Sequence, residues 1–291
     1  MSAGPIQRTA AILKHERIAR DTYRLRLAAP TIAQAIRPGQ FVMVRPAAEP
    51  GTDPLLGRAF ALYDVVRDHD GQATALDVVY LVMGKGTRAL SHKREGDSLS
   101  LWGPLGNGFG PPSPGSVVMV AGGVGQTPFV ALAKEWLGQA RYGLADAAQA
   151  HRETPLAERV DLLYGVRSAD LLAGVADFQA VGVHVDIATD DGSAGHHGYV
   201  TDLLERRLAQ GQRIGSIVAC GPPAMLAIVA KLAQRYSVTA QVSLENHMAC
   251  GFGACFSCVA PIRMPNGEID LRRVCVDGPV FPADNVVWGA D

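Results

Sequence analysis

Short apolar runs that alternate with polar positions fill the first third of the chain. The clearest are residues 23–27, 40–44 and 76–82, and turn sequences such as Arg37-Pro38-Gly39 separate them. Alternation with β-branched residues is typical of strands that bury one face. Their close spacing predicts a sandwich or barrel over residues 6 to about 110.

The pattern changes after the proline-rich connector Pro111–Gly115. Continuous apolar runs, typical of buried parallel strands, now alternate with segments of helical periodicity. Alternating strands and helices predict a parallel α/β sheet over residues 111–240. The expected strands are residues 116–121, 160–164, 183–188 and 217–220, and the expected helices are 129–139, 200–209 and 224–236. We interpret residues 138–159 as a helix extension or a surface insertion, and His196-His197 as loop residues.

Four of the five cysteines lie in the last segment, residues 241–291, which has few helical signals. They follow the pattern C-x4-C-x2-C, with sixteen further residues before the fourth, and they are Cys250, Cys255, Cys258 and Cys275. This is the plant-type spacing for a [2Fe-2S] cluster. Gly251 and Gly253 give the loop the backbone freedom to wrap around an inorganic core. A structural zinc site is the alternative, but zinc sites with four cysteines usually combine two C-x2-C pairs.

Composition and charge exclude several classes of function. The chain has 291 residues, of which 48% are hydrophobic and 19% charged, so it has material for packed cores. Its formal net charge of -1 provides no field to attract nucleic acid or an anionic membrane. We find no secretory signal and no apolar stretch that could span a membrane, and we expect a cytoplasmic protein.

Two turns in the middle segment are candidates for binding a nucleotide. Each follows an apolar strand and precedes a helix, where backbone N–H groups and the helix start can hold phosphate. The glycine spacing is not the standard dinucleotide fingerprint, and tight packing between strand and helix is the alternative. The candidate residues for NAD are Gly122, Gly123, Gly125, Thr127 and Pro128 in the first turn, and Cys220, Gly221 and Pro222 in the second.

Several motifs, taken together and in order, resemble the ferredoxin–NADP reductase superfamily. Within it, the chain resembles the electron-transfer subunits of class 1B dihydroorotate dehydrogenases. The motifs are GPLGNGF, AGGVGQTP, ACGPPAML, LENHMACGFGACFSCV and RRVCVDGPVF. The resemblance implies an α+β multidomain fold. An antiparallel FAD-binding β-barrel would cover residues 1–110, an NAD-binding α/β domain 111–240, and a small [2Fe-2S] domain 241–291.

The resemblance also implies which residues contact FAD. Ala59 and Ala61 stand where the family usually has Pro and Ser, so a hydrogen bond near the flavin ring is lost. Arg58 keeps the charge that pairs with phosphate. The implied FAD residues are Arg58, Ala59, Phe60, Ala61, Val79, Tyr80 and Leu81, with Gly86 and Thr87 at the pyrophosphate.

In the resembled family, electrons pass from dihydroorotate through FMN, the cluster and FAD to NAD+, in pyrimidine biosynthesis. The implied partner is an FMN-containing catalytic subunit, in a 2:2 heterotetramer. No motif supplies a base for dihydroorotate oxidation, so we assign no catalytic residue to this chain. Arg167-Ser168 suits either an adenosine ribose or a 2′-phosphate, which leaves NADP open. The alternatives are a subunit of a sulfide dehydrogenase or of a ferredoxin:NADP reductase, an oxygenase reductase, and a zinc-stabilised nucleotide-binding module.

Overall fold

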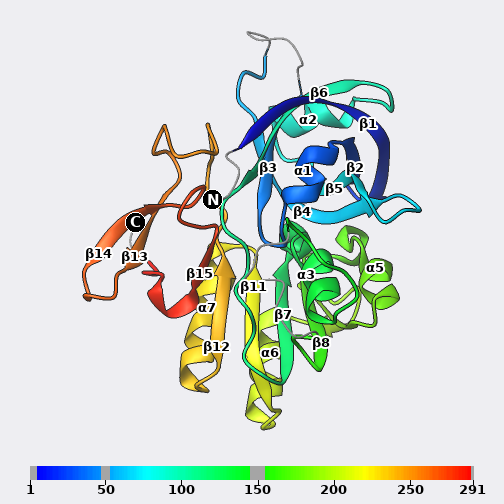
Figure 1. Cartoon of the computed structure of the whole chain (residues 1–291). Coiled ribbons are helices and arrows are strands. Elements are labelled where there is room, and N and C mark those ends of the chain that lie inside the picture. Colours follow the sequence, from blue (N-terminus) through cyan, green and yellow to red (C-terminus); the bar gives the residue numbers. More distant parts are fainter. Residues whose placement is uncertain (1–4, 47–52, 145–154, 290–291) are drawn as a thin grey trace.

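The computed structural model describes residues 5–46, 53–144 and 155–289, which form a closed barrel, a seven-stranded sheet and a two-stranded hairpin (Figure 1). The barrel is antiparallel, with the strand order β1-β2-β5-β4-β3-β6. This confirms the barrel expected from the alternating pattern. Its elements are β1 (Ile6–Ala19), β2 (Thr22–Ala28), α1 (Pro30–Ala35), β3 (Phe41–Arg45), β4 (Arg58–Arg67), β5 (Ala73–Leu81), α2 (Lys85–Ser91) and β6 (Ser98–Leu105).

Strand β2 shows why the alternation produces this barrel. Leu25 and Leu27 are fully buried inside it, while the intervening Arg26 lies on the other face. Arg26 donates from Nε to Oδ1 of Asp77 on the adjacent β5, at 2.8 Å. The ion pair satisfies a buried carboxylate, and the leucines supply the apolar core.

The seven-stranded sheet has the order β10-β9-β8-β7-β11-β12-β15, and all its strands are parallel except β15. The chain runs outward from β7 to β10 and then returns to the other side of β7 with β11. The order therefore reverses between β7 and β11, the kind of point where α/β sheets bind ligands. The elements are β7 (Ser116–Gly122), α3 (Phe129–Trp136), β8 (Arg159–Val166), α5 (Val175–Ala180), β9 (His184–Thr189), β10 (His196–His197), α6 (Val200–Ala209), β11 (Ile214–Cys220), α7 (Pro223–Arg235), β12 (Thr239–Ser243) and β15 (Val280–Pro282).

Both faces of this sheet are covered. Val118 and Val120 of β7 pack in one core with α6 and α7, while Val117 and Met119 pack in another with α3 and α5. This explains why β7 reads as a continuous apolar run.

Three local predictions differ from the structure. The glycine-rich turn itself contains a 3-10 turn, η1 (Gly123–Gln126), ahead of α3, and α3 ends at Trp136 because Gly138 adopts a positive φ of 74° just beyond it. His196-His197, expected in a loop, forms the short strand β10 beside β9. Of residues 138–159, positions 145–154 lie outside the described residues, and 138–144 are not helical.

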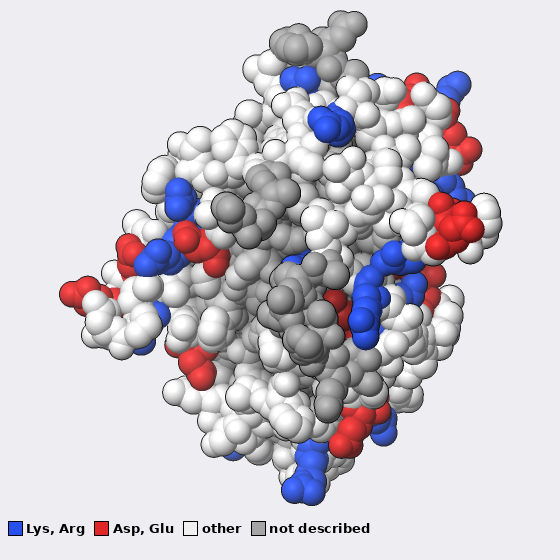
Figure 2. All heavy atoms as spheres, viewed as in Figure 1, with Lys and Arg blue, Asp and Glu red and all other residues white. Residues whose placement is uncertain are grey.

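Polar contacts join the barrel to the sheet layer. Asp177 of α5 accepts a hydrogen bond from Tyr63 at 2.5 Å and pairs with Arg24, both on barrel strands. Asp64 of β4 accepts from Tyr142 at 2.7 Å and pairs with Lys134 of α3. These contacts fix how the two layers face each other. Figure 2 shows both signs of charge scattered over the viewed face, without a continuous field of either sign.

The last segment returns to the sheet. It leaves β12, forms the hairpin of β13 (Val259–Arg263) and β14 (Ile269–Arg273), and comes back as β15, antiparallel to β12. Residues 244–279 are thus an excursion between two neighbouring strands. The predicted boundaries at 110 and 240 stay predictions. Within the described residues, no helix is long and apolar enough to cross a membrane.

Candidate functional site

The two glycine turns meet at the point where the strand order reverses. A Cβ on Gly122 would lie 2.7 Å from Cδ of Pro222, and a Cβ on Gly125 would lie 2.2 Å from the carbonyl oxygen of Cys220. Neither position has room for a side chain. Both glycines therefore let the turns pack together, which is the alternative role considered for them.

Gly123 is different from its neighbours. Its φ is +58°, and a Cβ there would have nothing within 4 Å. Its backbone thus faces open space at the carboxyl end of β7. Thr127 and Pro128 behind it are buried, and Pro128 caps α3. Of the first turn, Gly123 has the backbone that a phosphate can approach.

Cys220 lies beneath the second turn, only 5% exposed. Burial raises the pKa of its thiol well above the ordinary value, and the nearby carboxylate of Glu245 adds to this effect. Cys220 is therefore a neutral, small residue where the two turns meet. Gly221 has a φ of 152°, and a Cβ placed on it would lie 2.9 Å from the amide nitrogen of Gly122.

The residues expected at the flavin pyrophosphate lie together. A Cβ on Gly86 would lie 2.8 Å from Nε of Arg58, so the guanidinium lies directly against the first turn of α2. The Thr87 hydroxyl accepts hydrogen bonds from the amides of Met83 and Gly84, at 2.9 and 3.1 Å. The hydroxyl therefore stabilises the turn. The backbone N–H groups at the start of α2, together with Arg58, are the donors that can hold an anion.

The remaining flavin candidates divide between the two faces of β4 and β5. Phe60 and Tyr80 point into the barrel core, and the Tyr80 hydroxyl lies 2.9 Å from Nε2 of His15. Their side chains are thus occupied inside the barrel. On the outer side, Ala59 and Ala61 are small and half-buried, Val79 packs against the core beneath β7, and Leu81 is half-buried.

The four clustered cysteines form two pairs. Sγ of Cys255 lies 3.4 Å from Sγ of Cys250, and Cys258 and Cys275 contact each other. The second pair is buried, at 1% and 2% exposure, whereas Cys255 is exposed. In a [2Fe-2S] cluster each iron takes two thiolates, so two pairs fit it. Among the described His, Cys, Asp and Glu side chains, no group of three converges as a single-ion site requires.

The loop that carries the cysteines has the expected backbone. Gly251, Gly253 and Phe256 all have positive φ, at 81°, 89° and 56°. Hydrogen bonds from the Ser257 hydroxyl and amide lower the pKa of the Cys255 thiol, whereas burial raises that of Cys275. Donors aimed at sulfur favour the thiolate, the form that binds iron.

Three contacts that the motifs did not predict join the C-terminal segment to the barrel. Nε1 of Trp102 donates to the carbonyl oxygen of Cys250 at 2.9 Å. A Cβ on Gly251 would lie 2.5 Å from Cγ of Met43, which pairs with Ala59 across β3 and β4. Asn107, inside the GPLGNGF motif, exchanges hydrogen bonds with Val280 of β15 at 2.8 and 2.9 Å. Of the three, only the Asn107 contact had a signal in the sequence, the asparagine between two glycines in GPLGNGF.

Comparison with known proteins gives two family models that match parts of the chain. Residues 245–287 match the iron-sulfur cluster binding domain of dihydroorotate dehydrogenase B, and residues 119–231 match the oxidoreductase NAD-binding domain. Among solved structures, an NADH-dependent reduced ferredoxin-NADP oxidoreductase superposes with a TM-score of 0.76 at 28% identity, covering 96% of this chain and 90% of that one. The cytochrome b5 reductase domain of Ulva prolifera nitrate reductase, at 18% identity, shares the fold, with a TM-score of 0.58 and coverage of 80% and 93%.

Curated relatives match over nearly the whole chain. The dihydroorotate dehydrogenase B (NAD(+)) electron transfer subunit of Desulforamulus reducens is 36% identical over 96% of this chain and 97% of its own length. That of Geobacillus kaustophilus is 37% identical over 93% and 94%. With this identity over the full length, the chain belongs to the family of dihydroorotate dehydrogenase B electron transfer subunits.

Proposed function

We propose that this chain passes electrons between a catalytic subunit that oxidises dihydroorotate and NAD+, through a [2Fe-2S] cluster and FAD, in pyrimidine biosynthesis. The full-length relatives are named as electron transfer subunits of dihydroorotate dehydrogenase B (NAD(+)). The observation that supports it most directly is the docking of the cysteine loop on the barrel strands next to the flavin candidates. Cys250 and Gly251 contact β6 and β3, and β3 pairs with Ala59 on β4.

The pyridine nucleotide would bind where the two turns meet. Gly123 supplies an open backbone for the pyrophosphate, while Gly122 and Gly125 keep the turns in contact. Cys220, Gly221 and Pro222 line the other side, and the thiol of Cys220 is buried and neutral. The assignment of all eight residues to NAD is part of the proposal.

FAD would bind along the outer side of β4 and β5. Arg58 pairs with its pyrophosphate, and the amides of Gly86 and Thr87 at the start of α2 complete the anion site. Ala59 and Ala61 leave room for a flat ring next to the cysteine loop. When bound, FAD supplies the change between two-electron exchange with NAD and one-electron exchange with a cluster.

The partner would dock on the face that exposes Cys255. Phe252 and Phe256 are 54% and 61% exposed on the same loop, and Val276 beside Cys275 is 41% exposed. Exposed apolar side chains around a redox ligand suit a protein interface. The partner is the FMN-containing catalytic subunit, in a 2:2 assembly, and it supplies the base for dihydroorotate oxidation, for which no motif of this sequence is a candidate.

An anaerobic titration of the purified chain with NADH tests this proposal. We expect the flavin absorbance to bleach first and the cluster absorbance to follow, with NADH effective at lower concentration than NADPH. With the catalytic subunit added, dihydroorotate should bleach both. Metal analysis should give two irons per chain and little zinc. A colourless protein that contains zinc and releases no flavin would contradict the proposal.

The alternatives have weaker support. The ferredoxin-NADP oxidoreductase structure shares the whole fold, but at 28% identity, below the 36% and 37% of the two relatives above. The measurement that separates them is reduction by dihydroorotate in the presence of the catalytic subunit. A subunit of another complex would fail it while still responding to NADH.

A further inference from the structure

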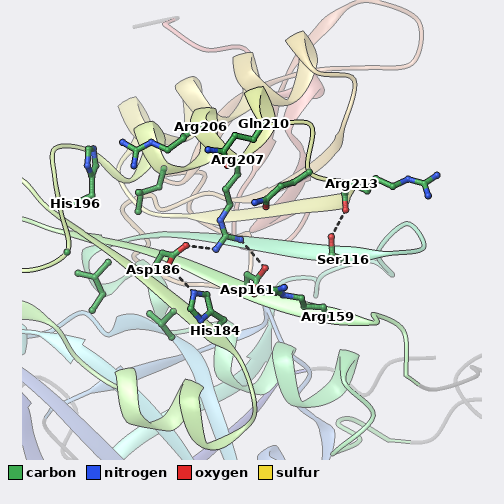
Figure 3. A pocket seen from close by; sticks show the side chains of 15 residues that line it. Ser116, Arg159, Asp161, His184, Asp186, His196, Arg206, Arg207, Gln210 and Arg213 are labelled. Carbon is green, nitrogen blue, oxygen red and sulfur yellow. Dashed lines mark hydrogen bonds and ion pairs between the residues drawn. The ribbon is translucent and has the colours of Figure 1, made fainter.

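A hollow of about 980 Å³ opens at the edge of the seven-stranded sheet opposite to the two glycine turns (Figure 3). Ser116, Arg159 and His184, the first residues of β7, β8 and β9, line it. Helix α6 and the segment after it form the other wall. Because these strands are parallel, their amino ends lie a full strand length from the proposed NAD site.

An ion network with a buried centre forms the floor of the hollow. Arg207 of α6 donates to Oδ2 of Asp161 on β8 at 2.9 Å and also pairs with Asp186 on β9. Its side chain is 11% exposed. Asp161 also pairs with Arg159, and Asp186 with His184, so both carboxylates are fully engaged. The network fixes α6 on the sheet and neutralises the carboxylates that would otherwise repel an anion.

The rim carries an excess of positive charge. Four arginines but only two aspartates line the hollow. Among the described residues, the side chains of Arg206 and Arg213 have no carboxylate partner, and both are exposed. Arg159, paired with Asp161, is 63% exposed. The guanidiniums of Arg206 and Arg213 can turn toward a ligand without breaking the ion network around Arg207.

Both ends of the hollow carry guanidiniums, and one end also carries an imidazole ring. Figure 3 places His196 and Arg206 toward one end, and Arg159, Ser116 and Arg213 toward the other. Ile187 and Leu203 add apolar surface to the lining. An aromatic ring and aliphatic side chains suit a planar base, while guanidiniums suit phosphates.

We propose that this hollow binds a polyphosphate anion, specifically a nucleotide, at a site separate from that of NAD. The volume exceeds what inorganic phosphate fills and lies at the upper end of the roughly 300–1,000 Å³ typical of pockets for small-molecule ligands. The excess charge of the lining matches a ligand with at least two negative charges. The inference rests on this lining alone and does not require the electron-transfer role.

Isothermal titration calorimetry on the FAD- and iron-loaded chain, with NAD+ in excess, tests the proposal. The probes are ATP and tripolyphosphate, both without magnesium. We expect one ATP per chain in addition to NAD+. The double substitution Arg206→Gln with Arg213→Gln should weaken ATP binding about tenfold or more, because two charge-assisted contacts are lost. A matched control, Lys231→Gln with Arg235→Gln on the adjacent α7, makes the same change in net charge outside the hollow.

The outcomes separate the possible ligands. Tighter binding of ATP than of tripolyphosphate supports a nucleotide, and equal binding supports the polyphosphate chemistry with an inorganic source. Three results would overturn the proposal: no binding of either probe, equal weakening in the control, or ATP binding that NAD+ displaces and that the Arg206 and Arg213 substitutions leave unchanged.

Discussion

Substitution by alanine should have different effects at two neighbouring glycines of the first turn. Gly125→Ala should mainly lower stability, and Gly123→Ala should mainly lower the affinity for NAD+. In Gly125→Ala, the added methyl group would lie 2.2 Å from the carbonyl oxygen of Cys220. Ordinary contact needs at least about 3.4 Å, so the turns must separate by roughly 1 Å. Overpacking of this kind costs about 1–3 kcal/mol. We expect the melting temperature of the chain to fall by several degrees, at about 2–4 °C per kcal/mol.

In Gly123→Ala, the added methyl group meets nothing within 4 Å, but the residue keeps a φ of +58°. A left-handed alanine costs about 1–2 kcal/mol, so the loss of stability should be smaller. The methyl group would, however, occupy the space into which the pyrophosphate must come. We expect the affinity for NAD+ to fall by about tenfold or more, equivalent to about 1.4 kcal/mol.

Thermal unfolding by circular dichroism and titration with NAD+, on the same preparations, give both quantities. Gly71→Ala is a matched control, because Gly71 also has a positive φ and open space but lies in a distant barrel hairpin. If Gly123→Ala binds NAD+ as tightly as the control does, the open backbone does not hold the pyrophosphate. If Gly125→Ala keeps the melting temperature of the unsubstituted chain, the packing role of that glycine is wrong.

Three further predictions concern other parts of the chain. Arg58→Gln should lower the affinity for FAD by about tenfold or more, measured as the FAD retained after desalting. Arg8→Gln, at an exposed position of β1, should retain FAD, and equal retention by both variants would remove Arg58 from the flavin site. Cys255→Ser should lose most of its iron by metal analysis and its brown colour, while Cys220→Ser should keep both, and iron loss from both variants would contradict the ligand assignment. Burial alone would raise the pKa of Asp186, but the hydrogen bond and charge of Arg207 outweigh it and hold that pKa below its ordinary value. The resulting stability is present above the unfolded pKa of about 4 and is lost as the pH falls through the folded value, so Asp186→Asn should unfold with a weaker pH dependence in acid than the unsubstituted chain.

Much of the fold could be predicted because local patterns encode it. The alternation in β2 and the continuous apolar run of β7 each reflect the environment of a single strand, which the sequence records directly. The helix α1 was missed because six residues are too few to show periodicity. The strand β10 was missed because two residues carry no pattern, and only the neighbouring β9 makes them a strand.

The site was predictable where chemistry depends on spacing, and not where it depends on contacts. The family matches support the [2Fe-2S] site and the NAD-binding fold that the cysteine spacing and the glycine turn predicted. The sequence could not show that Gly125 packs the two turns together while Gly123 has open space beside it. The contact of Gly125 with Cys220 depends on the pairing of β11 with β7, which are far apart in the sequence. Likewise, the Trp102 hydrogen bond to the cysteine loop spans 148 positions along the chain, and no local pattern reports it.

The return of the chain through β15 has a consequence for how such proteins can diversify. The cysteine-bearing segment begins after β12 and ends in β15, the strand paired with β12. Both of its ends are therefore held by strands of the nucleotide-binding sheet. A fusion or deletion that replaces the C-terminal segment would therefore also remove β15, the edge strand of the sheet. Substitutions on the exposed surface of the loop, in contrast, can change what it contacts while both strands stay paired.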